Sequence, residues 1–595
     1  MFLPTTKEEI FKLGWQAPDI IIVSGDTYID SPFNGSAVIG NYLTINGFKV
    51  AIIAQPDINS NEITRLGEPS LYWTVSAGAM DSLVANYTAT GKFRNEDDLT
   101  PGGINNRRPN RACMVYTNLI RRYFKNTKPI VLGGIEASLR RVVHYDLKDK
   151  KLRRSLLFDA KADILVYGMA EKTMLELSLA IKNNQDFRDI KGLCYISKEP
   201  KTNYIDIASF EECIENPNSF REMFKTFYNN SAYTNSKGLN QKHDGRYLIH
   251  NPPQDFLTQE ELDIIYDMDF TREVHPYYAK QGKVKAQDTI KFSVVSHRGC
   301  CGECNFCAIA VHQGKSVISR SKKSIIKEIN QLAQFADFKG YISDVGGPTG
   351  NMYKISCKVN GLVGKCKDKK CLYPTVCQNL VFSHNEQIDL LKEVSKNKKI
   401  KKVFISSGIR HDLIIADKND GINYLKYISE NNISGQLKIA PEHICDTVLD
   451  LMGKPKQSTF LDFMKDFKYI NKPLNQFLTC YFMVAHPGST LDNCKELVSF
   501  IKKNMNFSPQ QVQVFTPTPS TFSTMMYYTK QDIDGNDIFV EKDRNARMKQ
   551  KLEIIQLNSP KINNIDSRKF NYSKRTNLKY SNNNKYSNNK FRTKY

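Results

Sequence analysis

Several features common in other protein classes are missing from this 595-residue sequence. No run approaches the roughly 18 apolar residues that a helix needs to cross a bilayer. The N-terminal stretch MFLPTTKEEIFKLGW has two early glutamates and no long apolar stretch, which does not fit a secretory signal. No Ser/His/Asp order, paired-carboxylate spacing, Walker-type Gly-rich loop or short-period repeat stands out. We therefore expect a cytoplasmic protein that does not bind membranes.

Cysteine is too sparse for a disulfide scaffold, since 14 cysteines are spread over 595 residues. A cytosolic chain would keep them reduced. Clustered cysteines in that compartment more often bind metal or carry out redox chemistry. Two such groups are present, one within residues 300–307 and one within residues 357–377.

The net charge of +22 permits binding to nucleic acid or another polyanion through phosphate contacts. Lysine and asparagine are abundant throughout the chain, however, so a general compositional drift explains the same charge. A dedicated nucleic-acid surface is the less favoured interpretation.

The first 200 residues alternate strand-like and helix-like patterns. Apolar, β-branched runs occur at residues 18–26, 48–57, 129–134 and 162–168, and residues 34–47 show helical spacing. This alternation predicts a Rossmann-like α/β domain over residues 1–200 with a mostly parallel sheet. The loops SGDTYIDSP and GGIEAS follow such strands, where open sheets tend to bind ligands, although ordinary tight turns would look the same.

A second αβ series begins near residue 289, after a weaker pattern over residues 201–288 that we interpret as helical connecting structure. Six strand candidates, separated mostly by helical patterns, predict a partial (β/α)6 TIM-type barrel over residues 289–525. The candidates are residues 290–296, 340–346, 402–408, 435–441, 477–485 and 511–517.

The C-terminal part changes character. Residues 526–560 form an extension of the barrel, and residues 561–595 are rich in Asn, Ser, Lys and Arg, with Asp566 as the single acid. This basic tail cannot bury enough apolar area to offset the entropy of ordering, so we predict that it is disordered. Interleaved aromatic and basic residues would suit loose RNA contact, but a solvated tail without a function is equally compatible.

Cys300, Cys304 and Cys307 form a C-x3-C-x2-C motif directly after the first barrel strand. Iron–sulfur cubanes are normally held by four cysteines, so three local ligands leave one iron able to bind a substrate or cofactor. A zinc site would need Cys301 as its fourth ligand, and adjacent cysteines rarely both reach one tetrahedral ion. The spacing therefore favours an iron–sulfur cluster.

This motif, with Phe306 just before its last cysteine, resembles the cluster loop of radical S-adenosylmethionine (SAM) enzymes. More closely, the chain resembles the YgiQ-type family of largely uncharacterised radical SAM proteins. The resemblance covers the chain up to about residue 560, so that the basic tail falls outside it. Its motifs are GDTYIDSPFNGSAVIG, VGGPTGNMY, SSGIRHD, QLKIAPEH, FMVAHPGST and VFTPTPST.

The resemblance implies that Cys300, Cys304 and Cys307 each bind one iron of a 4Fe–4S cluster, whose open iron binds SAM. One electron, from a flavodoxin- or ferredoxin-like donor, would cleave SAM to methionine and a 5′-deoxyadenosyl radical that acts on an unknown substrate. Cys301 is expected to be a spectator. The catalytic residues of the substrate reaction remain unassigned.

Gly346 and Gly347 end the second barrel strand, and glycines there let a ligand approach the backbone closely. By resemblance they lie where radical SAM enzymes hold the amino group of SAM, and Phe306 belongs to the same cofactor site. Pro348 stands where many such enzymes have an acidic residue. A turn that binds no ligand is the competing interpretation.

Polar residues after later barrel strands are weaker candidates. Ser406, Ser407 and Glu442 are placed to contact the ribose or methionine part of SAM, or to make ordinary strand-end hydrogen bonds. His411 and His443 could serve a substrate site, but a lone histidine after a strand is more often structural.

A second thiol group comprises Cys357, Cys366, Cys371 and Cys377 in a loop rich in Gly and Lys. Four cysteines in so short a segment are consistent with an auxiliary iron–sulfur cluster or a zinc site. The irregular spacing is equally consistent with reduced surface thiols.

The first domain resembles the cobalamin-binding-like region found ahead of some radical SAM cores. Such cobalamin binders need a histidine in the first loop, and GDTYIDSPFNG contains none. We therefore expect this domain to shape the substrate site and not to bind cobalamin through a histidine.

The leading hypothesis is a radical SAM enzyme whose substrate is unknown, RNA being one possibility. The alternative is a basic RNA-binding protein with a structural iron–sulfur or zinc site and no radical chemistry. A site left open by a missing fourth ligand separates the two, since a structural site would be closed.

Overall fold

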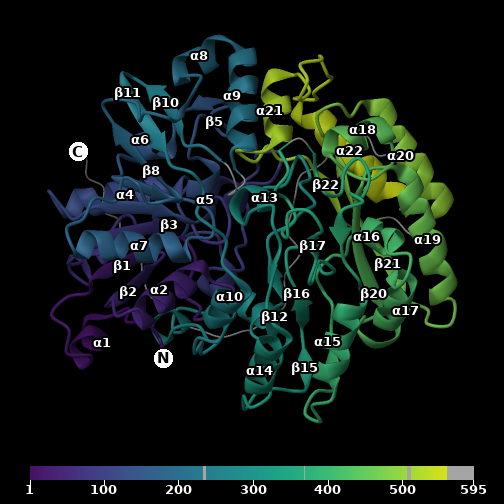
Figure 1. The fold of residues 1–595 in the computed structure, drawn as a ribbon, viewed down its shortest axis with the longest axis horizontal. Helices are drawn as coiled ribbons and strands as arrows, with labels where there is room; N and C mark the ends of the chain where they lie inside the picture. The colour runs from purple at the N-terminus through teal and green to yellow at the C-terminus, as the bar shows by residue number, and fades with distance from the viewer. Residues whose placement is uncertain (232–235, 368, 506–508, 510, 559–595) are drawn as a thin grey trace, which may run out of the picture. The chain divides into compact units, whose positions relative to one another are not determined.

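A nine-stranded sheet and a series of shorter parallel strands organise the chain, and they lie on the left and right of Figure 1. We call residues 1–288 the N-terminal module and residues 289–525 the barrel module. This computed structural model describes residues 1–558 except 232–235, 368, 506–508 and 510. The tail predicted over residues 561–595 lies outside the described residues.

The N-terminal sheet confirms the predicted α/β class. Its strand order is β2-β1-β3-β4-β7-β8-β11-β10-β9. The strands from β2 to β7 are parallel, as a Rossmann-like domain requires. These strands are β1 (Ile20–Ser24), β2 (Val50–Ala54), β3 (Tyr72–Ser76), β4 (Ile130–Gly133) and β7 (Ile164–Val166).

Both faces of this sheet are covered, because the strands are apolar on both sides. In β1, Ile20 and Ile22 belong to one buried cluster, whereas Ile21 and Val23 belong to another. Such near-continuous apolar runs are typical of parallel strands between two helical layers. The first cluster includes residues of α2 (Gly35–Ile45) and α7 (Glu171–Lys182), and the second includes residues of α4 (Ala112–Tyr123) and α6 (Leu156–Ala160).

The prediction of helical connecting structure over residues 201–288 is wrong in part, because three strands of this segment complete the sheet. Asp244 and Gly245 join β10 and β11 with positive φ values of 48° and 78°. An Asp-Gly pair between short strands is a hairpin signal that the weak apolar pattern obscured. The segment contains β9 (Ile205–Ile207), β10 (Leu239–His243), β11 (Arg246–His250), α8 (Phe210–Glu215), α9 (Pro217–Asn229), α10 (Gln259–Tyr266), α11 (Pro276–Ala279) and α12 (Ala286–Ile290). The strand β8 (Leu193–Ser197) links this hairpin to β7 by antiparallel pairing.

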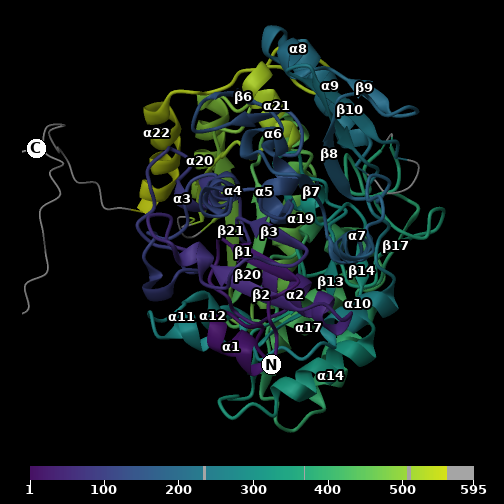
Figure 2. The same ribbon diagram turned by 90° about the vertical axis from the view of Figure 1, so that its left-hand side faces the viewer.

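The barrel module follows the predicted strand series. Parallel pairs join β12 to β16, β15 to β19, and β20 to β21 to β22, and a parallel bridge between Ile409 and Ile439 continues the series. The strands are β12 (Ser293–Val295), β15 (Tyr341–Ile342), β16 (Asp344–Gly346), β19 (Lys402–Val403), β20 (Gln436–Glu442), β21 (Phe477–Val484) and β22 (Val512–Val514). Figure 2 views the N-terminal sheet from outside, with β20 and β21 behind it.

Helices lie between most of these strands, as predicted. Their apolar faces pack on the barrel strands in one buried cluster. They are α14 (Lys322–Leu332), α15 (Asn385–Ser395), α16 (His411–Ala416), α17 (Gly421–Asn431), α18 (Asp446–Met452), α19 (Gln457–Asn471) and α20 (Leu491–Asn504), followed by α21 (Phe522–Thr529) and α22 (Arg544–Ile555). Within the described part of the chain, no helix is long and apolar enough to span a membrane.

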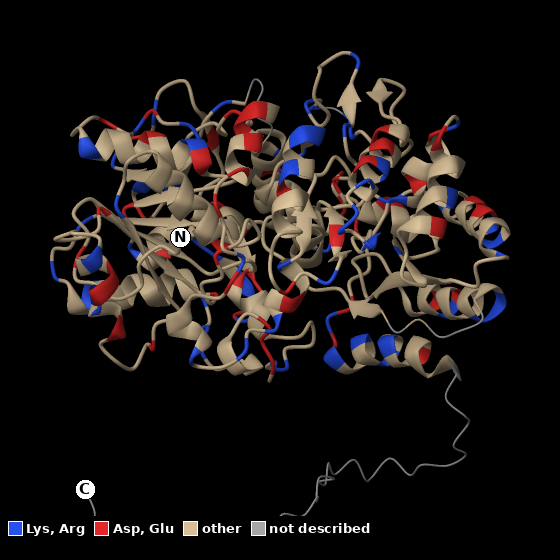
Figure 3. Ribbon diagram, turned by 90° about the horizontal axis from the view of Figure 1, so that it is seen from below, with Lys and Arg blue, Asp and Glu red and all other residues tan. Residues whose placement is uncertain are grey.

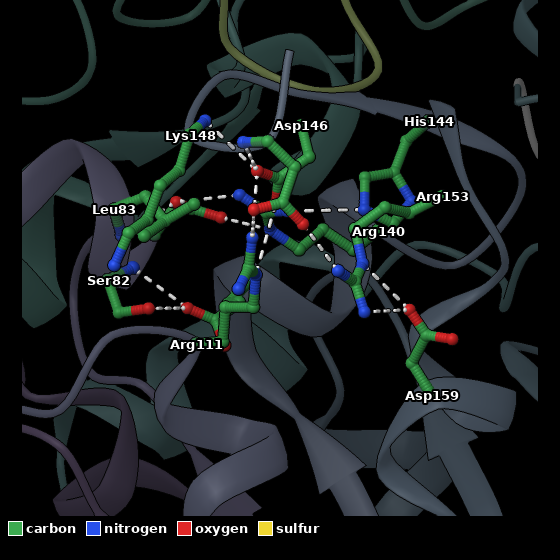
Figure 4. Close-up of polar contacts among 12 residues, drawn as sticks. Ser82, Leu83, Arg111, Arg140, His144, Asp146, Lys148, Arg153 and Asp159 are labelled. Atoms are coloured by element: carbon green, nitrogen blue, oxygen red, sulfur yellow. Dashed lines mark hydrogen bonds and ion pairs between the residues drawn. The ribbon is translucent and has the colours of Figure 1, made fainter. Parts of the chain in front are cut away.

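A buried ionic network braces the N-terminal module at the end of α5 (Gly134–Leu139), as Figure 4 shows. Arg140 forms ion pairs with Asp81 at 2.6 Å and with Asp146 at 3.0 Å. Arg111 also pairs with Asp146 at 3.0 Å. Burial would raise the pKa of Asp146, but the two arginines outweigh it and hold this pKa below its usual range.

We expect Arg140→Met to destabilise the protein by about 3–5 kcal/mol, because it leaves buried carboxylates without their cation. Urea unfolding monitored by circular dichroism measures the loss. Arg122→Met on exposed α4 surface is the matched control and should change stability by less than about 0.5 kcal/mol. Equal unfolding midpoints for the two variants would contradict a bracing role for the network.

Candidate functional site

The C-x3-C-x2-C loop follows β12 and β13 (His297–Arg298) and is fixed at several points of its backbone. Cys300 N donates to Gly314 O at 3.2 Å, and Asn305 N donates to Met452 O at 2.9 Å. The Asn305 side chain also donates, from Nδ2 to Leu451 O, at 2.9 Å. The loop is therefore held against α18 and against Gly314, which follows the loop in the sequence.

The thiols of Cys300, Cys304 and Cys307 form one electrostatic group. Burial, together with the neighbouring thiols of the group, raises the pKa of Cys300 to about 11 and that of Cys307 to about 12. Because metals bind thiolates, binding here would displace protons that the thiols otherwise keep at neutral pH. The structure thus brings the three predicted ligands together.

Cys301 has different surroundings. It is fully buried in an apolar cluster that includes Val317 and Leu372, and its Sγ lies 4.0 Å from Sδ of Met352. Burial raises its pKa well above the ordinary value. Its sulfur therefore packs as a small apolar group, and the group formed by the other three thiols has no fourth cysteine from this loop.

A buried arginine that the sequence pattern did not single out contacts the thiols. Nη1 of Arg410 lies 3.5 Å from Sγ of Cys304. Its guanidinium is held by Asp412, with Nε to Oδ1 at 2.8 Å and Nη2 to Oδ2 at 2.5 Å. This positive charge lowers the pKa of Cys300, opposing burial. The SSGIRHD motif contains both residues, but only the fold places them beside the cysteine loop.

A second buried charge fixes the loop to the N-terminal module. Glu303, at a positive φ of 44°, pairs with Nζ of Lys315 at 3.1 Å. Nζ of Lys315 lies 3.9 Å from the ring centroid of Tyr228, a residue of α9. A cation over an aromatic face is an attractive contact. It connects the cysteine loop to α9 of the N-terminal module.

Gly346 and Gly347 lie in crowded surroundings at the end of β16. A Cβ on Gly347 would stand 2.6 Å from Nε2 of His297, and one on Gly346 would stand 2.9 Å from Oγ of Ser407. Gly346 O already accepts from Ser296 N at 2.6 Å. The glycines are therefore required by protein packing, whatever ligand also binds here. Burial lowers the pKa of His297 to about 4, so this ring is neutral.

Asp344 ties the second and third barrel strands together at this edge. Ser406 N donates to Oδ1 of Asp344 at 2.8 Å, and the Ser407 hydroxyl donates to Oδ2. The Ser406 hydroxyl donates to Ser343 O at 2.7 Å. Both serines thus make strand-end hydrogen bonds, which was the competing interpretation of these two candidates.

Glu442 ends β20 with a positive φ of 69° and is half-buried. Burial raises its pKa to about 7, although Lys454 and Arg410 oppose the shift. A carboxyl group that titrates near neutrality next to the cysteine loop is unusual, and such groups cluster at functional sites.

The remaining candidates are packing residues. Phe306 is half-buried, with its ring edge-on to His486 at 6.3 Å between centroids. His411 is buried between Phe460 and Phe463. Burial lowers the pKa of His411 to about 3 and that of His443 to about 4, so both rings are neutral. Their environment is that of structural histidines.

A cavity of about 520 Å³ lies between the two modules. From the barrel module it is lined by Gly346, Gly347 and Pro348. From the N-terminal module it is lined by the ends of β1, β3, β4 and β7 and by the loops that follow them, including SGDTYIDSP and GGIEAS. The carboxyl ends of both sets of parallel strands therefore face one chamber, as expected for ligand sites in α/β folds.

The second cysteine group lies beside the first. Nζ of Lys370 donates to Glu303 O at 2.9 Å and to Oδ1 of Asn305 at 2.5 Å. Cys301 and Cys371 belong to the same buried cluster. The two cysteine loops, far apart in the sequence, are thus in direct contact.

Two family descriptions match the chain. "Radical SAM N-terminal" matches residues 2–293 and "Radical SAM superfamily" matches residues 294–501. A UPF0313 protein of Fusobacterium nucleatum is 54% identical over 92% of this chain and 98% of its own length. A UPF0313 protein of Thermotoga neapolitana is 47% identical over 93% of this chain and 98% of its own length.

Solved structures show more distant likeness. The methyltransferase TsrM from Kitasatospora setae, with cobalamin and a 4Fe–4S cluster bound, has a TM-score of 0.48 and 13% identity, over 85% of this chain and 77% of that one. The cobalamin-dependent radical enzyme OxsB has a TM-score of 0.47 and 12% identity, over 88% of this chain and 57% of that one.

Proposed function

The chain belongs to the radical SAM superfamily and to the UPF0313 family, and on this premise we propose that it uses SAM to start radical chemistry on a substrate held between its two modules. Proteins of the superfamily bind a 4Fe–4S cluster and SAM. When bound, the cluster supplies one electron that cleaves SAM and leaves a carbon radical able to abstract hydrogen.

The grouping of Cys300, Cys304 and Cys307, with the Cys301 sulfur packed against Met352, is the observation that carries the proposal. Thiolates are the ligands that iron–sulfur clusters require. Three donors leave one iron without a protein ligand, which fits a cluster that binds SAM through that iron. These three residues would hold the cluster, and Arg410 would offset its negative charge.

The chamber supports a division of labour between the modules. The Gly346–Pro348 strand end lines the chamber, and Glu442 raises the pKa of Cys307, so we assign both to the SAM side. The loops after β1 and β4 close the opposite wall and would hold the substrate and exclude water. We place the boundary between these two parts near residue 288.

The size of the chamber limits what enters it. A volume of about 520 Å³ lies in the range of small-molecule sites, which is roughly 300–1,000 Å³. The reacting part of the substrate is therefore a small molecule, or one extended group of a larger one.

The surface charge bears on RNA as a substrate. Lys and Arg alternate with Asp and Glu over most helices in Figure 3, whereas α22 is mainly basic. Because of this basic helix, RNA is one substrate class to test.

Anaerobically reconstituted protein should convert SAM to 5′-deoxyadenosine and methionine when a one-electron donor such as dithionite or reduced flavodoxin is added. Liquid chromatography measures both products. The control omits the reductant. Cluster-loaded protein that binds SAM but never releases 5′-deoxyadenosine would contradict the proposal and favour the RNA-binding alternative with a structural metal site. The cytoplasmic location, with its reducing conditions, belongs to the same proposal.

A further inference from the structure

The segment that contains the second cysteine group is an excursion between the second barrel strand and α15. It is closed at its base by antiparallel pairing of β17 (Ser356–Cys357) with β18 (Leu380–Val381). Cys357 lies on the first of these strands, and Cys377 precedes the second, with its N–H donating to Cys371 O at 2.9 Å. The fold therefore returns the end of the excursion to its beginning.

All four thiols of this segment line one small pocket. Its volume is about 70 Å³, and its wall includes Cys357, Cys366, Cys371 and Cys377. Cysteines separated by up to 20 positions thus surround a common space.

Amide groups point at these sulfurs. Gly364 N donates to Sγ of Cys371 at 3.2 Å, and Nδ2 of Asn360 donates to Sγ of Cys366 at 3.5 Å. Hydrogen bonds from amides to cysteine sulfur stabilise thiolates and are among the interactions that tune iron–sulfur clusters. A neutral surface thiol would gain little from them.

The charge around the pocket has the sign that bound thiolates need. Lys365, Lys369 and Lys370 line it together with the cysteines. Five lysines and one aspartate lie between Cys357 and Cys377 in the sequence. A cluster with four thiolate ligands carries net negative charge, which nearby cations stabilise.

We propose that Cys357, Cys366, Cys371 and Cys377 bind a second 4Fe–4S cluster, distinct from the one bound by the C-x3-C-x2-C loop. A cubane binds each thiolate at a separate corner, so its ligands surround a space. A single zinc ion requires four sulfurs about 2.3 Å from one point. Among the described residues no three His, Cys, Asp or Glu side chains converge on one ion in that way, and this holds for both cysteine groups.

Four cysteine ligands leave no iron open, so this cluster would not bind SAM. Its loop contacts the first cysteine loop through Lys370 and through the shared cluster of Cys301 and Cys371. The second cluster would therefore order the wall beside the first cysteine loop.

The test measures iron, sulfide and zinc in full-length protein reconstituted without oxygen. Wild type should hold about eight irons and eight sulfides per chain, and the Cys300→Ala/Cys304→Ala/Cys307→Ala variant about four. The Cys366→Ala/Cys371→Ala variant should also fall to about four. Cys213→Ala, a buried cysteine of α8, is the matched control and should keep the wild-type content.

Electron paramagnetic resonance of the reduced proteins gives a second readout. The signal that remains in the triple variant should not respond to SAM, because all its irons have protein ligands. Loss of all iron from the triple variant, or one zinc per chain at the second group, would overturn the inference of a second cluster. Either result would leave the proposed function intact. If a variant fails to fold, the wild-type protein alone still tests the inference. Addition of SAM should then alter only about half of its cluster signal, and a response of the whole signal would overturn the inference.

Discussion

Cys304→Ala protein will release no 5′-deoxyadenosine above the level of a reaction without enzyme, and its iron content will fall by about half. Cys304 is the member of the thiol group that Arg410 contacts, at 3.5 Å. Removing it leaves two thiols for a cluster that needs at least three protein ligands in this loop. The measurement is product formation under reducing, oxygen-free conditions, together with iron analysis of the same sample.

Cys301→Ala is the matched control, because it lies in the same loop and its sulfur packs in an apolar cluster. It should keep wild-type iron and at least about half of the product yield, with a stability loss near 1 kcal/mol for the removed buried sulfur. If Cys301→Ala lost the cluster and Cys304→Ala kept it, the assignment of ligands would be wrong.

The order of strands and helices was largely predictable from local patterns. The runs at residues 18–26 and 48–57 became β1 and β2, and residues 34–47 became α2, because parallel strands covered on both faces read as continuous apolar runs. The hairpin of β10 and β11 was missed, since a short strand with polar residues, such as LNQKH of β10, lacks the apolar alternation that marks a strand. Only its Asp-Gly turn gave a signal.

The candidate site was likewise predictable from the sequence only in part. The spacing of Cys300, Cys304 and Cys307 is local, so the sequence was sufficient to group them. The contact of Arg410 with Cys304 joins residues 106 positions apart, and no spacing in the chain encodes it. The convergence of the second cysteine group on one pocket also depends on the pairing of β17 with β18, which only the folded chain shows.

Arg410→Met should lower the rate of SAM cleavage by about 10–100-fold, the usual effect of removing a group that supports metal ligands. The guanidinium beside Cys304 stabilises negative charge on the thiolates and on a reduced cluster. Its loss should therefore shift the reduction potential of the first cluster to more negative values. Redox titration with and without SAM measures the shift, and cleavage assays measure the rate.

The ion pair with Asp412 makes a single substitution ambiguous, because it leaves a buried carboxylate without a partner. The double variant Arg410→Met/Asp412→Asn removes both charges and should restore folding while keeping the low potential and the low rate. Asp412→Asn alone removes a negative charge and leaves the guanidinium unpaired, so it should shift the potential in the opposite direction, to more positive values. If the double variant regained wild-type potential and activity, Arg410 would act only as a structural partner of Asp412. The proposal that its charge sets the potential of the first cluster would then be wrong.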